Sequence, residues 1–153
     1  MEGEVKNLGR DEDVAEIRGR IETLTAADER RWGLMSVGEM LCHVREAYVI
    51  TIAGGEARML KGPLPPKLLK VMALKLPLKW PKTIQTVPTL KRDAMPPPGE
   101  FEMEKVRLLE AFEAFARARE SRAVHPMFGA MEPWDWMRWG YLHADHHLRQ
   151  FGR

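Results

Sequence analysis

The sequence contains little that could cross-link the chain or anchor it in a membrane. Its single cysteine, Cys42, cannot form an intramolecular disulfide, which fits a reducing compartment. No uninterrupted apolar run approaches the roughly 20 residues that a membrane-spanning helix needs. The first residues are acidic and lack the apolar segment of a signal peptide. We therefore expect a cytoplasmic protein without a membrane span.

Acidic residues are also missing from a long internal interval. Between Glu56 and Asp93 the chain carries no aspartate or glutamate, although its formal net charge is only +2. The basic residues of this interval are Arg58, Lys61, Lys67, Lys70, Lys75, Lys79, Lys82, Lys91 and Arg92. Two interpretations remain open: a solvated, irregular connection, or an electropositive wall that attracts an anionic small molecule.

Two other partners rank lower for the basic interval. Nucleic acid is not expected, because the basic residues are not interleaved with exposed aromatic residues and no known binding motif is present. A membrane-surface segment is conceivable, since leucines alternate with lysines over residues 68–76. Packing of these leucines on the rest of the protein is the simpler interpretation.

Helical periodicity is abundant. At 153 residues the chain is about one domain long, and apolar residues recur at helical spacing in four long segments. The expected long helices cover residues 13–24, 36–54, 101–122 and 133–152. A short helix over 67–76 lies within a basic, proline-rich insertion at about 56–100, and residues 83–90 are expected to be extended. We therefore predict a single all-α domain over residues 1–153, a four-helix bundle with a long crossover between helices two and three.

The second long helix has the clearest start signal. Ser36 and Glu39 match a capping box, in which each side chain bonds the backbone amide of the other residue. This pattern assigns Glu39 to the helix cap rather than to catalysis. Gly54 and Gly55 are expected to end the helix, because glycine readily adopts a positive φ.

Three of the five histidines lie close together near the C-terminus. His143 and His147 stand four residues apart, so on a helix their rings share one face and can bind one metal ion. His43 borders the apolar face of the second long helix. If these two helices are neighbours, three imidazoles converge and leave an open position for water or substrate. The alternative for His43 is an ordinary buried core histidine.

Other side chains near this group are assigned lesser roles. His146 should point about 100° away from His147 on the helix, so it is expected to support the ligands from outside or to lie at the surface. Trp136 and Gln150 are candidates for lining a pocket, with core packing and simple exposure as their alternatives. Cys42 is expected to be a buried, inert thiol.

Two motifs resemble the DinB-like metalloprotein superfamily. They are Met-Ser-Val-Gly-Glu-Met-Leu-Cys-His over residues 35–43 and Leu-His-Ala-Asp-His-His-Leu-Arg-Gln over residues 142–150. The family pattern places one histidine near the middle of helix two and a His-x-x-x-His pair on the last helix. The resemblance implies a four-helix bundle that binds a divalent metal, commonly zinc or nickel, through His43, His143 and His147.

The resemblance also implies two hypotheses about function. Several relatives are thiol-dependent transferases or isomerases that use bacillithiol, mycothiol or glutathione, and relatives are often dimers. One hypothesis is therefore an enzyme that transfers a low-molecular-weight thiol to a small, anionic, electrophilic substrate, or a related hydrolase, acting as a homodimer. The other is a non-catalytic bundle that keeps a metal for stability, as a binding or stress-response module. The long basic, proline-rich insertion departs from the family pattern, so the resemblance leaves the substrate class open.

Overall fold

The computed structural model describes residues 4–54, 59–82, 90–119 and 124–153. Within these ranges the secondary structure is helical, apart from one isolated β-bridge between His125 and Gly129. The helices are α1 (Asp11–Glu22), α2 (Val37–Ile52), α3 (Pro66–Lys70), the π-helical η1 (Val71–Lys75), the 3-10 helix η3 (Arg92–Ala94), α4 (Phe101–Arg117) and α5 (Pro133–Gln150). The predicted all-α class is confirmed for this part of the chain. No helix among these residues is long and apolar enough to cross a membrane.

The long helices differ from the expected boundaries mainly at their ends. α1 runs over Asp11–Glu22 rather than 13–24, and α4 ends at Arg117 rather than at residue 122. Ala118 leaves the helical region at φ −80° and ψ 73°, which stops α4 early. α5 ends at Gln150, and Gly152 then takes a φ of +74°, a conformation that glycine tolerates. Residues 83–89 of the segment expected to be extended lie outside the described residues.

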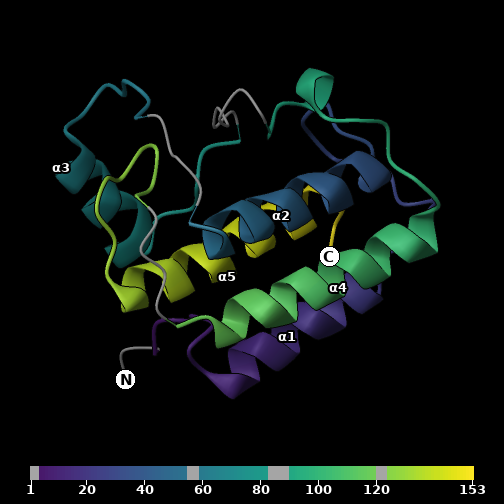
Figure 1. Ribbon diagram of the computed structural model, residues 1–153, viewed down its shortest axis with the longest axis horizontal. Coiled ribbons are helices and arrows are strands. Elements are labelled where there is room, and N and C mark those ends of the chain that lie inside the picture. Colours follow the sequence, from purple (N-terminus) through teal and green to yellow (C-terminus); the bar gives the residue numbers. More distant parts are fainter. Residues whose placement is uncertain (1–3, 55–58, 83–89, 120–123) are drawn as a thin grey trace.

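The long helices pack side by side (Figure 1). α1 lies against α4 and α5, and α2 also lies against α4 and α5. The aromatic side chains of Tyr48 on α2 and Phe115 on α4 meet in the core, with 4.7 Å between their ring centroids. The short α3 and η1 lie at one end of these helices, where η1 contacts α5. This packing brings the middle of α2 close to the C-terminal half of α5.

The start of α2 has the predicted capping box. The backbone amide of Glu39 donates to Ser36 Oγ, and the backbone amide of Ser36 donates to Glu39 Oε1, both at 3.2 Å. The other carboxylate oxygen of Glu39 accepts a hydrogen bond of 2.6 Å from Arg92 Nε of η3. Glu39 therefore caps α2 and also ties the end of the segment between α2 and α4 to this helix.

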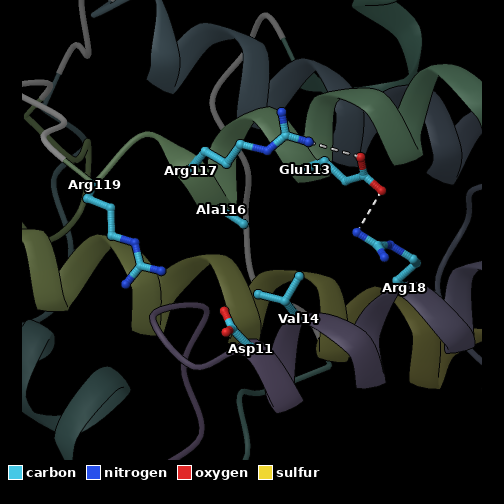
Figure 2. Close-up of a pocket in the computed structure, with 7 residues that line it drawn as sticks. All are labelled: Asp11, Val14, Arg18, Glu113, Ala116, Arg117 and Arg119. Atoms are coloured by element: carbon cyan, nitrogen blue, oxygen red, sulfur yellow. Dashed lines mark hydrogen bonds and ion pairs between the residues drawn. The ribbon is translucent and has the colours of Figure 1, made fainter.

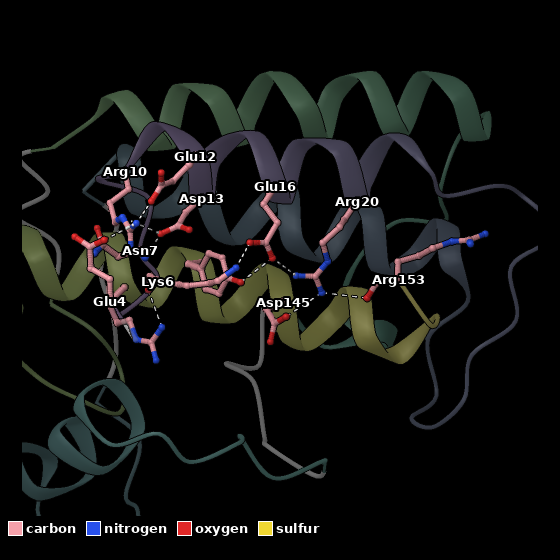
Figure 3. A network of polar contacts seen from close by, with 12 residues as sticks. Glu4, Lys6, Asn7, Arg10, Glu12, Asp13, Glu16, Arg20, Asp145 and Arg153 are labelled. Carbon is pink, nitrogen blue, oxygen red and sulfur yellow. Dashed lines mark hydrogen bonds and ion pairs between the residues drawn. The ribbon is translucent and has the colours of Figure 1, made fainter. Parts of the chain in front are cut away.

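A network of charged side chains joins the outer face of α5 to α1 (Figure 3). Arg20 Nη2 donates to Asp145 Oδ1 at 2.9 Å and to the backbone oxygen of Arg153 at 3.0 Å. The hydroxyl of Tyr141 donates to Glu16 Oε1 at 2.9 Å. Because these contacts engage the outer face of α5, they leave its opposite face, which carries His143 and His147, to the interior.

Gly140 allows α5 to approach its neighbours closely. A Cβ atom at this position would lie 2.3 Å from Phe115 Cε1 and 2.9 Å from Leu8 Cδ1, and both of those side chains are buried. The backbone oxygen of Gly140 also accepts a hydrogen bond of 2.7 Å from the buried hydroxyl of Tyr48 on α2. The absence of a side chain at Gly140 therefore sets the distance between α5 and the helices around it.

We expect Gly140→Ala to destabilise the protein, although alanine favours helix by up to about 1 kcal/mol over glycine. The added methyl group overlaps a packed aromatic ring, and overpacking typically costs about 1–3 kcal/mol. Urea unfolding followed by circular dichroism measures the difference. Gly19→Ala on α1 is the matched control, because its Cβ would meet nothing within 4 Å, and it should leave stability unchanged or raise it. Equal stability of the Gly140→Ala variant and the wild type would contradict the close approach.

Candidate metal centre

Three histidines from two helices meet in the interior. His43 comes from α2, and His143 and His147 come from successive turns of α5. One ring nitrogen of each histidine lies within 4.8 Å of the corresponding nitrogens of the other two. Their exposed fractions are only 3%, 9% and 7%. The structure thus brings together the three residues that the spacing of the sequence singled out.

Hydrogen bonds hold two of these rings in a tautomer that leaves Nε2 free to bind a metal ion. His43 Nδ1 lies 3.0 Å from the backbone oxygen of Leu90, and His147 Nδ1 lies 2.7 Å from Gln150 Oε1. Both partners are oxygens that only accept hydrogen bonds, so the proton of each neutral imidazole sits on Nδ1. The lone pair is then on Nε2. Such outer hydrogen bonds are usual for metal-binding histidines, because they orient the ring and raise its basicity.

The third ring is held by stacking instead. The imidazole of His143 stacks on the indole of Trp139 at a centroid distance of 4.9 Å and an interplanar angle of 12°. Tyr48 approaches it edge-on at 6.3 Å. Nδ1 of His143 is buried, and no hydrogen-bond partner for it is present among the described residues. A buried polar atom without a partner costs the folded protein about 1–3 kcal/mol. A cation bound at this nitrogen would offset that cost.

Burial keeps all three imidazoles neutral. Desolvation lowers the pKa of His43, and it lowers the pKa of His143 and His147 well below the usual histidine value. Repulsion between the neighbouring rings adds to this effect at His143 and His147. A neutral imidazole is the form that binds metal, so the group is ready to accept a divalent ion at neutral pH.

Gln150 is enclosed by the loop that precedes α2. The backbone amide of Arg31 donates to the backbone oxygen of Gln150 at 2.6 Å. Gly33 has a φ of +85°, and a Cβ atom there would lie 2.7 Å from Gln150 Nε2. The Gln150 side chain is therefore fixed on one side by this loop and on the other by His147. Gln150 therefore acts as the hydrogen-bond acceptor for His147, one of the three candidate metal ligands.

The other candidates lie around the three histidines. Trp136 is buried and contacts Trp139 at 5.5 Å, so it stands one ring away from His143. His146 does not belong to the group of convergent nitrogens, but it is buried rather than exposed, and its ring lies 5.2 Å from that of His147. Cys42 is buried, and burial is the main reason that its pKa rises to about 11, which keeps the thiol protonated and unreactive.

The comparison with protein families adds one finding. Residues 7–153 match a family described as "Protein of unknown function (DUF1569)". The chain belongs to the DUF1569 family. No curated protein and no solved structure matches it. The match includes all three histidines and Gln150, and the family description carries no activity.

The sequence did not predict several groups that support the histidines in this DUF1569 chain. Trp139 lies four residues before His143 on α5, so helical spacing could have identified it. The carbonyl of Leu90 is a backbone group and leaves no signal in the side-chain sequence. Trp32 and Trp80 contact His146 from two separate loops, at centroid distances of 4.9 Å and 5.9 Å, and only the tertiary structure brings them there.

Two clefts in the structure lie away from the histidines. One of about 350 Å³ lies between α1 and α4, where Glu113 pairs with Arg18 at 2.7 Å and with Arg117 at 3.3 Å (Figure 2). The other, of about 400 Å³, lies at the start of α2 and is bordered by Glu39 and Cys42. The three histidines line neither cleft.

His125 is a buried histidine with a different role. It lies in the loop expected before α5, and its Nδ1 accepts hydrogen bonds from the backbone amides of Met127 at 3.1 Å and Phe128 at 3.2 Å. Its ring stacks on that of Phe128 at 4.2 Å. Burial lowers the pKa of His125 from 6.5 to about 3, and protonation of Nδ1 would remove both hydrogen bonds.

We expect stability to fall on acidification, with a measurable share from His125. Its pKa is about 3 in the folded protein and 6.5 in the reference state, so the unfolded chain binds the extra proton between these values. Its contribution is complete above about pH 6.5 and is lost as the pH falls towards 3, at about 1.4 kcal/mol per pH unit.

The variant His125→Asn tests this expectation, because the amide oxygen can still accept the two backbone hydrogen bonds but does not titrate. Urea unfolding of the chelator-treated protein between pH 7 and pH 5 should show a smaller slope of stability with pH in the variant than in the wild type. Identical slopes in the two proteins would refute the assignment, whatever the difference in absolute stability.

Proposed function

We propose that this protein is a divalent-metal-dependent enzyme of the DinB-like superfamily, with His43, His143 and His147 as ligands of a zinc or nickel ion. Its proposed activity is the transfer of a low-molecular-weight thiol to an electrophilic small molecule. The observation that carries the proposal is the meeting of three buried, neutral imidazoles from two helices, with one nitrogen of each ring within 4.8 Å of those of the other two. Three histidines and an open fourth position are the donor set of several catalytic zinc sites.

The residues present fit such an ion. Zinc and nickel are well suited to imidazole ligands, and the outer hydrogen bonds of His43 and His147 leave Nε2 of each ring without a proton. When bound, the ion supplies a Lewis-acidic position that lowers the pKa of a coordinated thiol or water. The contribution of the chain is to hold the protons of His43 and His147 on Nδ1 through Leu90 and Gln150. Trp139 and Tyr48 shield the ring of His143 from water.

The proposal also includes the architecture of the domain. The packing of α1 and α2 against both α4 and α5 supports a four-helix bundle, with the residues between α2 and α4 as its long crossover. A single domain, a cytoplasmic location, a small anionic substrate and a homodimer remain predictions.

A non-catalytic, metal-stabilised protein is the second candidate, and one observation favours it. Among the described residues, the side chains in ring contact with the three histidines are aromatic residues and His146. The convergent group itself contains no carboxylate. A general base next to the open position is therefore not evident, and metal binding for stability alone would need none.

Metal analysis tests the ligand assignment. We expect the purified wild type to hold about one ion per chain by mass spectrometry, as three imidazole ligands with one open position imply. His143→Ala should retain at least about tenfold less, because two ligands do not make a stable site. His125→Asn is the matched control, since it removes a buried histidine outside the group and should keep the metal. Equal, negligible metal in the wild type and His143→Ala would overturn the proposal.

Turnover is measured separately, with metal-loaded protein, a thiol such as bacillithiol, mycothiol or glutathione, and a chromogenic electrophile. Consumption of thiol by the wild type and not by His143→Ala supports an enzyme. A melting temperature that falls on chelation, together with no turnover with any of the three thiols, supports the non-catalytic alternative.

The outer hydrogen bond to His147 gives a sharper prediction. Gln150→Ala removes the acceptor at Nδ1 and should weaken metal binding about 10- to 100-fold, the usual effect of losing such a contact. Gln150→Glu keeps an oxygen acceptor in this place and should bind at least as tightly as the wild type. Competition with a chromophoric chelator measures both affinities. A Gln150→Ala affinity within about twofold of the wild type would show that the contact does not support a metal ligand.

A further inference from the structure

Two tryptophans from distant loops stand beside the candidate metal centre. Trp32 lies between α1 and α2, and Trp80 lies after η1. Both contact the ring of His146, at centroid distances of 4.9 Å and 5.9 Å. The ring of His146 in turn lies 5.2 Å from that of His147. The two indoles, which we call the tryptophan pair, are therefore one side chain away from the group of three histidines.

Both indoles contact a buried ring, that of His146, and are themselves only partly covered. His146 is only 5% exposed, and its Nδ1 is buried without a hydrogen-bond partner among the described residues. The indoles themselves are only partly buried, so each still presents ring surface that the protein does not cover. Partly exposed aromatic faces beside an unsatisfied buried nitrogen are what a site for a flat ligand with a polar group offers.

One lysine lies beside the tryptophan pair. Lys82 Nζ lies 5.9 Å from the ring centroid of Trp32, and within the described ranges no carboxylate forms an ion pair with it. Over residues 59–82 the chain has six lysines and no acidic residue. Among these lysines, Lys70 is neutralised by Asp135 at 3.2 Å. The ammonium group of Lys82 is therefore free to pair with an anion that reaches the face of Trp32.

We propose that Trp32, Trp80 and Lys82 form a binding subsite for planar aromatic carboxylates next to the candidate metal centre. The indoles stack on the ring of the ligand, and Lys82 pairs with its carboxylate. This inference rests on the proposed function, since it assigns the substrate class of that same site. It also favours one interpretation of the basic interval, namely that it attracts an anionic small molecule. In this proposal a single lysine, Lys82, selects a negatively charged ligand.

Isothermal titration calorimetry with 2-naphthoate tests the subsite on metal-loaded protein. We expect 2-naphthoate to bind, and the uncharged 2-naphthamide and the non-aromatic cyclohexanecarboxylate to bind more weakly. Trp32→Ala and Trp80→Ala should each weaken binding about 3- to 10-fold, the range of an aromatic pair. Lys82→Met should weaken it by a similar factor at low salt, and the loss should shrink at about 0.5 M salt because screening removes the ion pair.

Matched controls separate this subsite from general packing and charge. Trp134→Ala removes an exposed tryptophan at the start of α5, and Lys61→Met removes an exposed lysine of the same basic segment; neither should change the affinity. Trp32→Phe keeps an aromatic ring and should restore most of the affinity lost in Trp32→Ala. Melting temperatures by circular dichroism check that each variant is folded. If an alanine variant does not fold, Lys82→Met with Lys61→Met as its control tests the subsite.

The outcomes distinguish this inference from the proposed function. Absence of 2-naphthoate binding to metal-loaded wild type at millimolar concentration overturns the subsite and leaves the metal centre standing. Unchanged affinity in folded Trp32→Ala, Trp80→Ala and Lys82→Met also overturns it, and means that the indoles only cover His146. Binding that depends on these residues in a protein that takes up no metal supports the subsite while the metal proposal fails.

Discussion

The contact between α2 and α5 at Tyr48 and Gly140 determines the geometry of everything around the histidines. The Tyr48 hydroxyl, fully buried, donates to the Gly140 carbonyl at 2.7 Å. Tyr48 follows His43 by five residues, and Gly140 precedes His143 by three, so the two helices run antiparallel where they meet. This hydrogen bond fixes their register, and a shift of one turn, about 5.4 Å, would separate His43 from the pair on α5. Substituting Gly140 would push α5 away from its neighbours and disturb the same register.

Burial gives the three histidines their chemical character. An isolated imidazole is partly protonated near neutral pH, whereas here desolvation holds all three in the neutral form. The same burial makes each ring costly to the fold unless its nitrogens find partners. The protein supplies an outer partner to His43 and to His147, whereas Nδ1 of His143 is buried without one among the described residues. A cation that contacted this nitrogen would offset the cost of leaving it without a partner.

Much of this arrangement could be predicted from the sequence, and the limits are physical. The capping box at Ser36 and the face shared by His143 and His147 depend on local spacing, so both were predictable. The end of α4 at Arg117 was not, because its C-cap has an ordinary alanine and no glycine signal. The carbonyl of Leu90 carries no residue-specific signal at all. The meeting of loop tryptophans at His146 depends on long-range packing, which periodicity does not contain.

The supports of His43 and His147 differ in how they respond to mutation. His147 relies on the side chain of Gln150, so one nucleotide change could remove its acceptor. His43 relies on a backbone carbonyl at Leu90, which every amino acid supplies and no side-chain replacement deletes. Random mutation should therefore remove the hydrogen-bond acceptor of His147 on α5 more readily than that of His43. In a set of related sequences, position 150 should be strongly constrained in identity, whereas position 90 should vary as long as its backbone keeps its path.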